Sequence, residues 1–121
     1  MSQMPAISEA ELEVLQVLWK ERKPMKIQDV LDRLEKNAWK YNTVGTLLLR
    51  LEAKNAVTSQ KNGRVIMYTP AIDEVEYKKQ KTGDFVNRLY NGSVKDLAVS
   101  LFQSEKMSPE DIEEIRRMFN L

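Results

Sequence analysis

The sequence contains no cysteine and no histidine, and it has only four glycines and four prolines in 121 residues. Without cysteine the chain can form neither disulfides nor thiolate metal sites, and without histidine it can build no Ser-His-Asp triad and no imidazole-ligated metal. Carboxylates are the plausible catalytic groups left, and their main cluster lies beside a predicted helix start, where acids are expected anyway. We therefore expect no enzymatic activity, no cofactor and no metal.

The sequence also lacks a long apolar run and a strong net charge. No run approaches the roughly 18 residues of a membrane span, and the acidic N-terminal segment does not resemble a signal peptide. We therefore expect a cytoplasmic protein without membrane insertion. The net charge of +1 hides a local excess, because residues 36–64 hold six basic side chains against the single Glu52. Nucleic acid remains a candidate partner, because partner choice follows the distribution of charge.

Hydrophobic periodicity predicts three short helices in the first half of the chain. Residues 8–11 have the pattern of a capping box, and the leucines that follow at helical spacing predict a helix over residues 9–21. The same spacing predicts helices over residues 26–36 and 41–54. Asn55 suits a left-handed exit from the third helix.

A change of period after the third helix predicts a β-hairpin. Residues 56–60 and 64–69 have strand-like composition and flank Asn62-Gly63. We expect this dipeptide to form the turn, because both residues accept the positive φ angles that a tight hairpin requires. Three helices followed by a two-stranded hairpin is the outline of a winged helix-turn-helix.

The second half of the chain is predicted to be helical. One weakly amphipathic helix covers residues 72–90, a second follows from Val94, and Ser108-Pro109 is typical of a third helix start. These helices have apolar faces but too few residues to fold well alone, so they either dock on the first domain or pair with a second chain. Pairing is favoured, because a helix-turn-helix usually needs a dimer to read two half-sites.

The predicted fold is mainly α with a small β-hairpin. Residues 1–71 form an N-terminal winged helix-turn-helix DNA-binding domain, and residues 72–121 form a C-terminal helical dimerisation domain. The predicted dimerisation residues are apolar side chains of the second domain, namely Phe85, Leu89, Val94, Leu97, Ala98, Leu101, Phe102, Ile112, Ile115 and Met118.

The predicted third helix carries candidate DNA-binding residues. Four polar side chains recur at intervals of three or four residues and share one line along the helix, and these are Thr43, Thr46, Arg50 and Lys54. Threonines near the N-terminal end can reach base edges, and cations further along can meet phosphates. Gly45 would allow close approach of the backbone. The alternative is an ordinary solvated helix face.

The hairpin tip is the second candidate. Lys61 and Arg64 would lie over the sugar-phosphate backbone and add affinity without sequence preference. The alternative is that these cations only keep an edge hairpin soluble.

Four segments carry a family resemblance: ISEAELEVLQVLWK, the pattern W-x3-T-V-x-T-L-L-L-R-L over residues 39–51, GRVIMYTP and FVNRLYNGS. In this order they resemble the penicillinase and methicillin-resistance repressors, the BlaI/MecI family, over nearly the whole chain. The resemblance implies a homodimer with winged-helix domains and interlocking C-terminal helices. It also implies binding to a double-stranded DNA operator with inverted TACA/TGTA half-sites and repression of antibiotic (β-lactam) resistance genes.

The same resemblance implies residue roles and an induction route. Thr43 and Thr46 match positions that face the bases, and matches near bases or backbone are Lys40, Tyr41, Asn42 and Arg50. Induction in the family runs through a membrane sensor-transducer protease system, and the repressor is cut between Asn and Phe, where this chain has Ser100 and Leu101. Two alternatives remain open: a family repressor that responds to another signal, and a winged-helix protein-protein interaction module.

Overall fold

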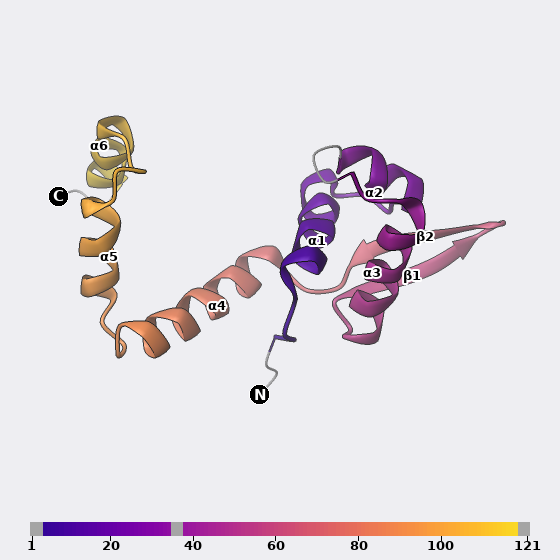
Figure 1. The fold of residues 1–121 in the computed structure, drawn as a ribbon, viewed down its shortest axis with the longest axis horizontal. Helices are drawn as coiled ribbons and strands as arrows, with labels where there is room; N and C mark the ends of the chain where they lie inside the picture. The colour runs from indigo at the N-terminus through magenta and orange to yellow at the C-terminus, as the bar shows by residue number, and fades with distance from the viewer. Residues whose placement is uncertain (1–3, 35–37, 119–121) are drawn as a thin grey trace. The chain divides into compact units, whose positions relative to one another are not determined.

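The computed structural model describes residues 4–34 and 38–118 (Figure 1). The chain divides into two compact units, Met1–Tyr77 and Lys78–Leu121, and the division falls inside a helix. The elements in chain order are α1 (Glu9–Glu21), α2 (Ile27–Arg33), α3 (Tyr41–Ala53), β1 (Val57–Asn62), β2 (Val65–Pro70), α4 (Glu74–Leu89), α5 (Val94–Gln103) and α6 (Pro109–Met118). The predicted fold class, mainly α with one small hairpin, is confirmed.

Helix α1 has the predicted bounds because its start signal is local. The Ser8 hydroxyl accepts the backbone N–H of Glu11 at 3.1 Å, and the Glu11 carboxylate accepts the backbone N–H of Ser8 at 3.0 Å. This capping box satisfies two backbone donors that the first helical turn leaves unpaired. The helix ends at Glu21, where Arg22 adopts the left-handed conformation with φ 55.

Helices α2 and α3 lie within their predicted ranges. Helix α2 is shorter than the predicted residues 26–36, because Lys26 is its N-cap and Leu34 leaves the helical conformation. Positions 35 and 36 of that prediction lie outside the described residues. Helix α3 ends at Ala53, and Asn55 takes the predicted left-handed exit with φ 62.

The turn of the hairpin lies one residue later in the chain than predicted. Asn62 pairs with Val65, so the two turn residues are Gly63 and Arg64 rather than Asn62 and Gly63. Only the first of them has positive φ (67), which matches the requirement of a type II′ turn.

A tertiary contact explains this register. Tyr68 exchanges backbone hydrogen bonds with Met25 at 2.8 and 2.9 Å, so its N–H and C=O point away from β1. In an antiparallel pair such outward-pointing residues alternate with inward-pointing ones. A turn at Asn62-Gly63 would place Tyr68 in a position where both groups face β1. The observed turn frees them for Met25.

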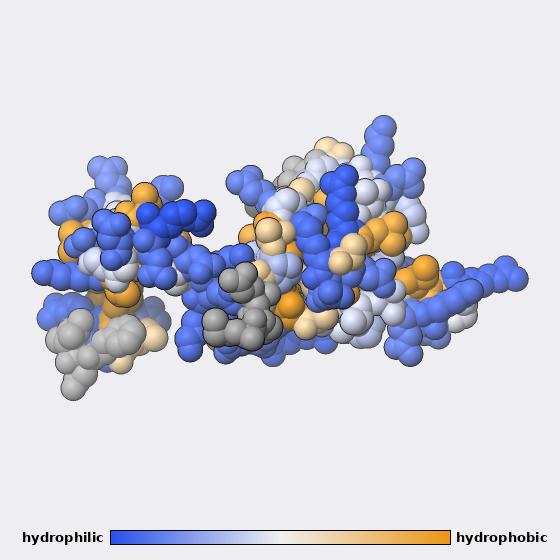
Figure 2. All heavy atoms as spheres, turned by 90° about the horizontal axis from the view of Figure 1, so that it is seen from below, coloured by the Kyte–Doolittle hydropathy of each residue, from blue (hydrophilic) through white to orange (hydrophobic). Residues whose placement is uncertain are grey.

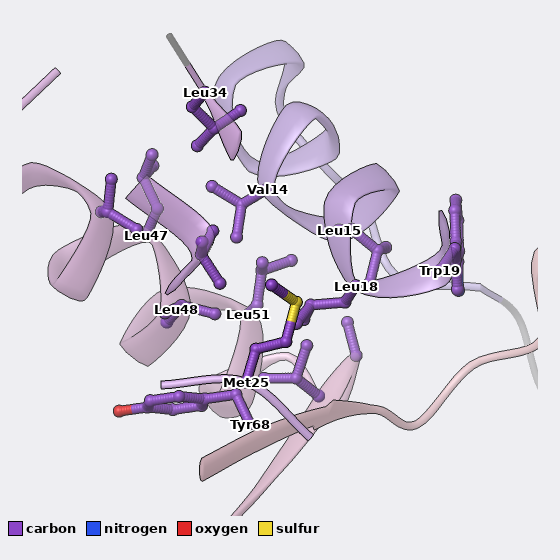
Figure 3. Close-up of a cluster of buried hydrophobic side chains, with 14 of the residues drawn as sticks. Val14, Leu15, Leu18, Trp19, Met25, Leu34, Leu47, Leu48, Leu51 and Tyr68 are labelled. Atoms are coloured by element: carbon purple, nitrogen blue, oxygen red, sulfur yellow. The ribbon is translucent and has the colours of Figure 1, made fainter. Parts of the chain in front are cut away.

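One buried cluster holds the first unit together (Figure 3). Three completely buried side chains point toward one another in this view. They are Leu18 of α1, Leu51 of α3, and Met25 of the segment between α1 and α2. Trp19 ties the start of α4 to α1, because its indole N–H donates to the carbonyl of Ile72 at 3.0 Å and its ring packs on Tyr77. The core thus fixes the backs of α3 and the hairpin and leaves their other faces exposed.

The second unit has well-capped helices but little core. The Ser93 hydroxyl caps α5 and the Ser108 hydroxyl caps α6, each by accepting a backbone N–H at 3.1 Å. Among its described residues only Val86 is buried. Figure 2 shows apolar side chains reaching the surface of this unit among hydrophilic ones. Throughout the described residues, no helix has the length and apolar character that crossing a membrane requires.

Candidate nucleic-acid interface

Helix α3 turns one face to the core and the opposite face outward. Val44, Leu47, Leu48 and Leu51 are buried. At 3.6 residues per turn, the line most nearly opposite to this stripe consists of exposed side chains: Asn42, Thr46, Leu49 and Ala53. Thr43 and Arg50, also exposed, flank that line on one side. The exposed face therefore includes the predicted residues Asn42, Thr43, Thr46 and Arg50, and it adds Leu49.

Thr46 already uses its hydroxyl hydrogen. Its Oγ1 donates to the backbone carbonyl of Asn42 at 2.9 Å, one turn earlier in the same helix. A threonine hydroxyl has a single hydrogen, so what remains for a ligand is a lone pair and the methyl group. In this conformation Thr46 can accept a hydrogen bond or make an apolar contact.

Gly45 serves the helix packing rather than the exposed face. It is buried, and a Cβ added there would lie 3.4 Å from the Cδ1 atom of Ile27 in α2. The predicted role of Gly45 in close approach to DNA is therefore wrong. Gly45 instead faces Ile27 of α2, within van der Waals reach of its side chain.

The hairpin end and the starts of two helices enclose a hollow of about 350 Å³. Exposed Lys61 and Arg64 lie at that end of the hairpin, which Figure 2 shows as hydrophilic. The residues around the hollow are Lys26, Ile27, Gln28, Tyr41, Arg64, Val65 and Ile66. Lys26 and Arg64 thus border a partly apolar depression beside the N-terminal end of α3. The exposed predicted residue Lys40 directly precedes that end of the helix.

Lys26 and Gln28 were missed by the sequence analysis. No motif distinguishes them, and they lie in a segment predicted only as part of a helix. They join Tyr41 and Arg64 only when α2, α3 and the hairpin fold against each other.

Lys54 is engaged inside the protein instead of on the exposed face of α3. Its ammonium donates to the backbone carbonyl of Ala6 at 2.7 Å and to the Glu11 carboxylate. Glu11 is only 3% exposed, so its charge needs this partner. The structure therefore corrects the prediction that Lys54 contacts phosphate. Lys54 ties the end of α3 to the start of α1.

This ion pair predicts a pH-dependent contribution to stability. Burial raises the pKa of the Glu11 carboxyl, but the hydrogen bonds from Lys54 and from the Ser8 backbone outweigh it, and the pKa lies below its ordinary value. Because the pKa of Glu11 is lower in the folded state than in the unfolded state, its ionised carboxylate stabilises the fold. This stabilisation is complete above about pH 5 and is lost as the pH falls further. We expect Glu11→Gln to lower the free energy of unfolding by about 1–2 kcal/mol at neutral pH, less than for a fully buried pair because Lys54 is partly exposed.

Urea unfolding of both forms at several pH values checks this expectation. The difference between wild type and Glu11→Gln should shrink toward pH 3. Glu9→Gln, an exposed change in the same helical turn, serves as the control and should have little effect. An equal cost for the two variants at neutral pH would contradict the assigned role of the ion pair.

The predicted dimerisation residues fall into two groups. The exposed ones are Phe85, Leu89, Val94, Leu101, Phe102 and Met118. The half-buried ones, in α5 and α6, are Leu97, Ala98, Ile112 and Ile115. A groove of about 660 Å³ runs between α5 and α6, and Leu101, Ile115 and Met118 contribute to its lining. Their pairing with a second copy of the chain stays a prediction.

The predicted cleavage position lies within a helix. Ser100 and Leu101 are both exposed and belong to α5. Proteases favour exposed loops, so a cut at this bond requires α5 to unfold locally first.

Comparison with known proteins identifies similar sequences along nearly the whole chain. The profile of the penicillinase repressor family matches residues 7–120. The chain is 40% identical over 116 residues to the penicillinase repressor of Bacillus licheniformis, with 95% of this chain and 90% of that protein covered. It is 27% identical over 115 residues to the methicillin resistance regulatory protein MecI of Staphylococcus aureus, with 94% and 93% covered.

Two solved structures resemble the chain. One is the DNA binding domain of the repressor BlaI in solution, with 45% identity and a TM-score of 0.53, covering 64% of this chain and 94% of that one. The other is the monomeric form of Bacillus licheniformis BlaI in complex with the blaP half-operator, with 45% identity, a TM-score of 0.52 and the same coverage.

Proposed function

Because the chain belongs to the penicillinase repressor family, we propose that it is a homodimeric transcriptional repressor that binds a double-stranded DNA operator. The proposed operator is an inverted repeat with TACA/TGTA half-sites, and the proposed targets are antibiotic (β-lactam) resistance genes. The observation that carries the proposal is the exposed face of α3 beside a cationic hairpin, in a chain of which 64% matches, at 45% identity, a repressor solved on its half-operator.

In this proposal α3 enters the major groove. Side chains on the N-terminal part of its exposed face read base edges, and these are Asn42, Thr43 and Thr46. Side chains around it hold the sugar-phosphate backbone, and these are Lys26, Lys40, Tyr41, Arg50, Lys61 and Arg64. The core described above keeps α3 and the hairpin in a fixed geometry, so the contacts are largely preorganised before DNA arrives.

Two substitutions separate base contacts from backbone contacts. Lys61→Ala should weaken binding to operator and scrambled duplexes by the same factor and flatten the salt dependence by about one unit of slope, because one phosphate contact is lost. Thr46→Ala should weaken binding to the operator alone, by about 5-fold, because a base contact is lost. Fluorescence anisotropy at two salt concentrations measures both effects.

The control for the first substitution is Lys20→Ala, which removes an exposed cation from the end of α1. Operator binding that survives both Lys61→Ala and Thr46→Ala unchanged would reject the proposed interface. Binding of the wild type to neither duplex would favour the protein-protein interaction module.

We further propose that induction acts on the second unit. A cut between Ser100 and Leu101 would divide the apolar stripe of α5, weaken the dimer and so weaken operator binding through loss of the linked half-site. The proposed agent is a membrane sensor-transducer protease system. Mass spectrometry of the chain from β-lactam-treated cells tests this: a fragment ending at Ser100 supports it, and release of an intact chain favours another signal.

A further inference from the structure

Leu49 is an exposed leucine on the proposed recognition helix. Its side chain is 59% exposed, while the neighbouring Leu48 is completely buried. It lies at the centre of the outward line of α3, between Thr46 and Ala53. The core does not use Leu49, so folding alone does not account for a large apolar side chain at this position.

The surroundings of Leu49 combine an apolar centre with one cationic side chain at its side. Thr46 has its hydroxyl hydrogen bound to the Asn42 carbonyl, so its methyl group is available beside Leu49. Ala53 continues the apolar line, and Arg50 lies at its side. In the major groove, the thymine C5-methyl is the apolar group that base pairs present, and phosphates border it. The apolar line of α3 matches the thymine methyl group, and Arg50 at its side matches a bordering phosphate.

We propose that Leu49 is a specificity-determining residue that contacts the C5-methyl group of a thymine in the operator. The inference rests on the proposed function, since it assumes that α3 lies in the major groove. Leu49 is about 4.5 Å further along the helix axis than Thr46, so the two side chains face neighbouring positions along the same line of the helix. The N-terminal end of a recognition helix is the part nearest the bases, and a leucine reaches further than a threonine from a position later in the helix.

A deoxyuridine scan tests this contact in the full-length protein. Each thymine of the half-site is replaced in turn by deoxyuridine, which pairs identically and lacks only the methyl group. At one thymine, wild type should lose about 4-fold in affinity, the equivalent of one buried methyl group, while Leu49→Ala should lose nothing further. On the unmodified operator, Leu49→Ala should bind about 5-fold more weakly than wild type, and Leu49→Met should restore most of the loss.

Two controls accompany the scan. Val75→Ala removes another strongly exposed aliphatic side chain, from α4, and should leave operator binding unchanged. Circular dichroism confirms that each variant is folded.

The outcomes distinguish this inference from the proposed function. If wild type and Leu49→Ala respond alike to every deoxyuridine while operator specificity persists, the contact is wrong and the repressor function stands. If Leu49→Ala weakens operator and scrambled duplexes equally, the contact is not with a base and the inference is also wrong. If wild type itself cannot distinguish the two duplexes, the proposed function fails and this inference fails with it.

Discussion

Replacing Phe102 with aspartate is expected to separate the dimer and to weaken binding to the complete operator by about 100-fold or more. Phe102 is 43% exposed on α5, with exposed Leu101 beside it. A carboxylate placed in an apolar interface costs several kcal/mol unless it finds a partner. Two linked half-sites bind far more tightly than one, so a monomer loses most of the affinity without any change in α3.

Sedimentation velocity and operator titration together measure this effect. Gln103→Asp is the matched control, because it adds the same charge at the adjacent exposed polar position. Affinity for an isolated half-site should be equal in wild type and both variants. A Phe102→Asp protein that sediments as a dimer would show that the interface lies elsewhere.

Leu48→Ala is expected to reduce stability, whereas Leu49→Ala is expected to reduce operator affinity. Leu48 is fully buried in the core cluster, so Leu48→Ala should lower the free energy of unfolding by about 2–5 kcal/mol, through lost transfer energy and the cavity left behind. Leu49→Ala should change it by no more than about 0.5 kcal/mol, because the side chain is exposed and alanine favours helix.

The two variants therefore form a pair on adjacent positions of one helix. Urea unfolding gives the stability difference, and anisotropy under fully native conditions gives the operator affinity. Leu48→Ala should bind almost normally while it is folded, whereas Leu49→Ala should bind more weakly. Equal stability losses for both would contradict the assignment of the two faces of α3.

Features encoded by neighbouring residues were predictable from the sequence. The capping box of α1 spans residues 8–11, and the left-handed Asn55 follows directly from the end of α3. The apolar spacing of α3 identified its buried stripe, and the polar residues between those positions identified much of its exposed face.

Features that depend on distant residues were not predictable in this way. The turn moved by one residue because Tyr68 bonds to Met25, more than forty positions earlier. Lys54 was assigned to DNA because nothing in its own helix reveals Glu11, whose carboxylate lies 43 positions away in sequence. Leu49 was not predicted as a DNA contact because the prediction considered only polar side chains on that face, although the apolar spacing already leaves Leu49 outside the buried stripe.

A fluorescence-anisotropy titration of the full chain against two duplexes tests the proposed repressor function most directly. One carries the inverted TACA/TGTA repeat and the other a scrambled sequence, each at about 50 and 200 mM salt. We expect tight binding to the repeat, two chains per duplex, and affinity that falls steeply with salt. Equal affinity for both duplexes, or binding to neither, would contradict the proposed function.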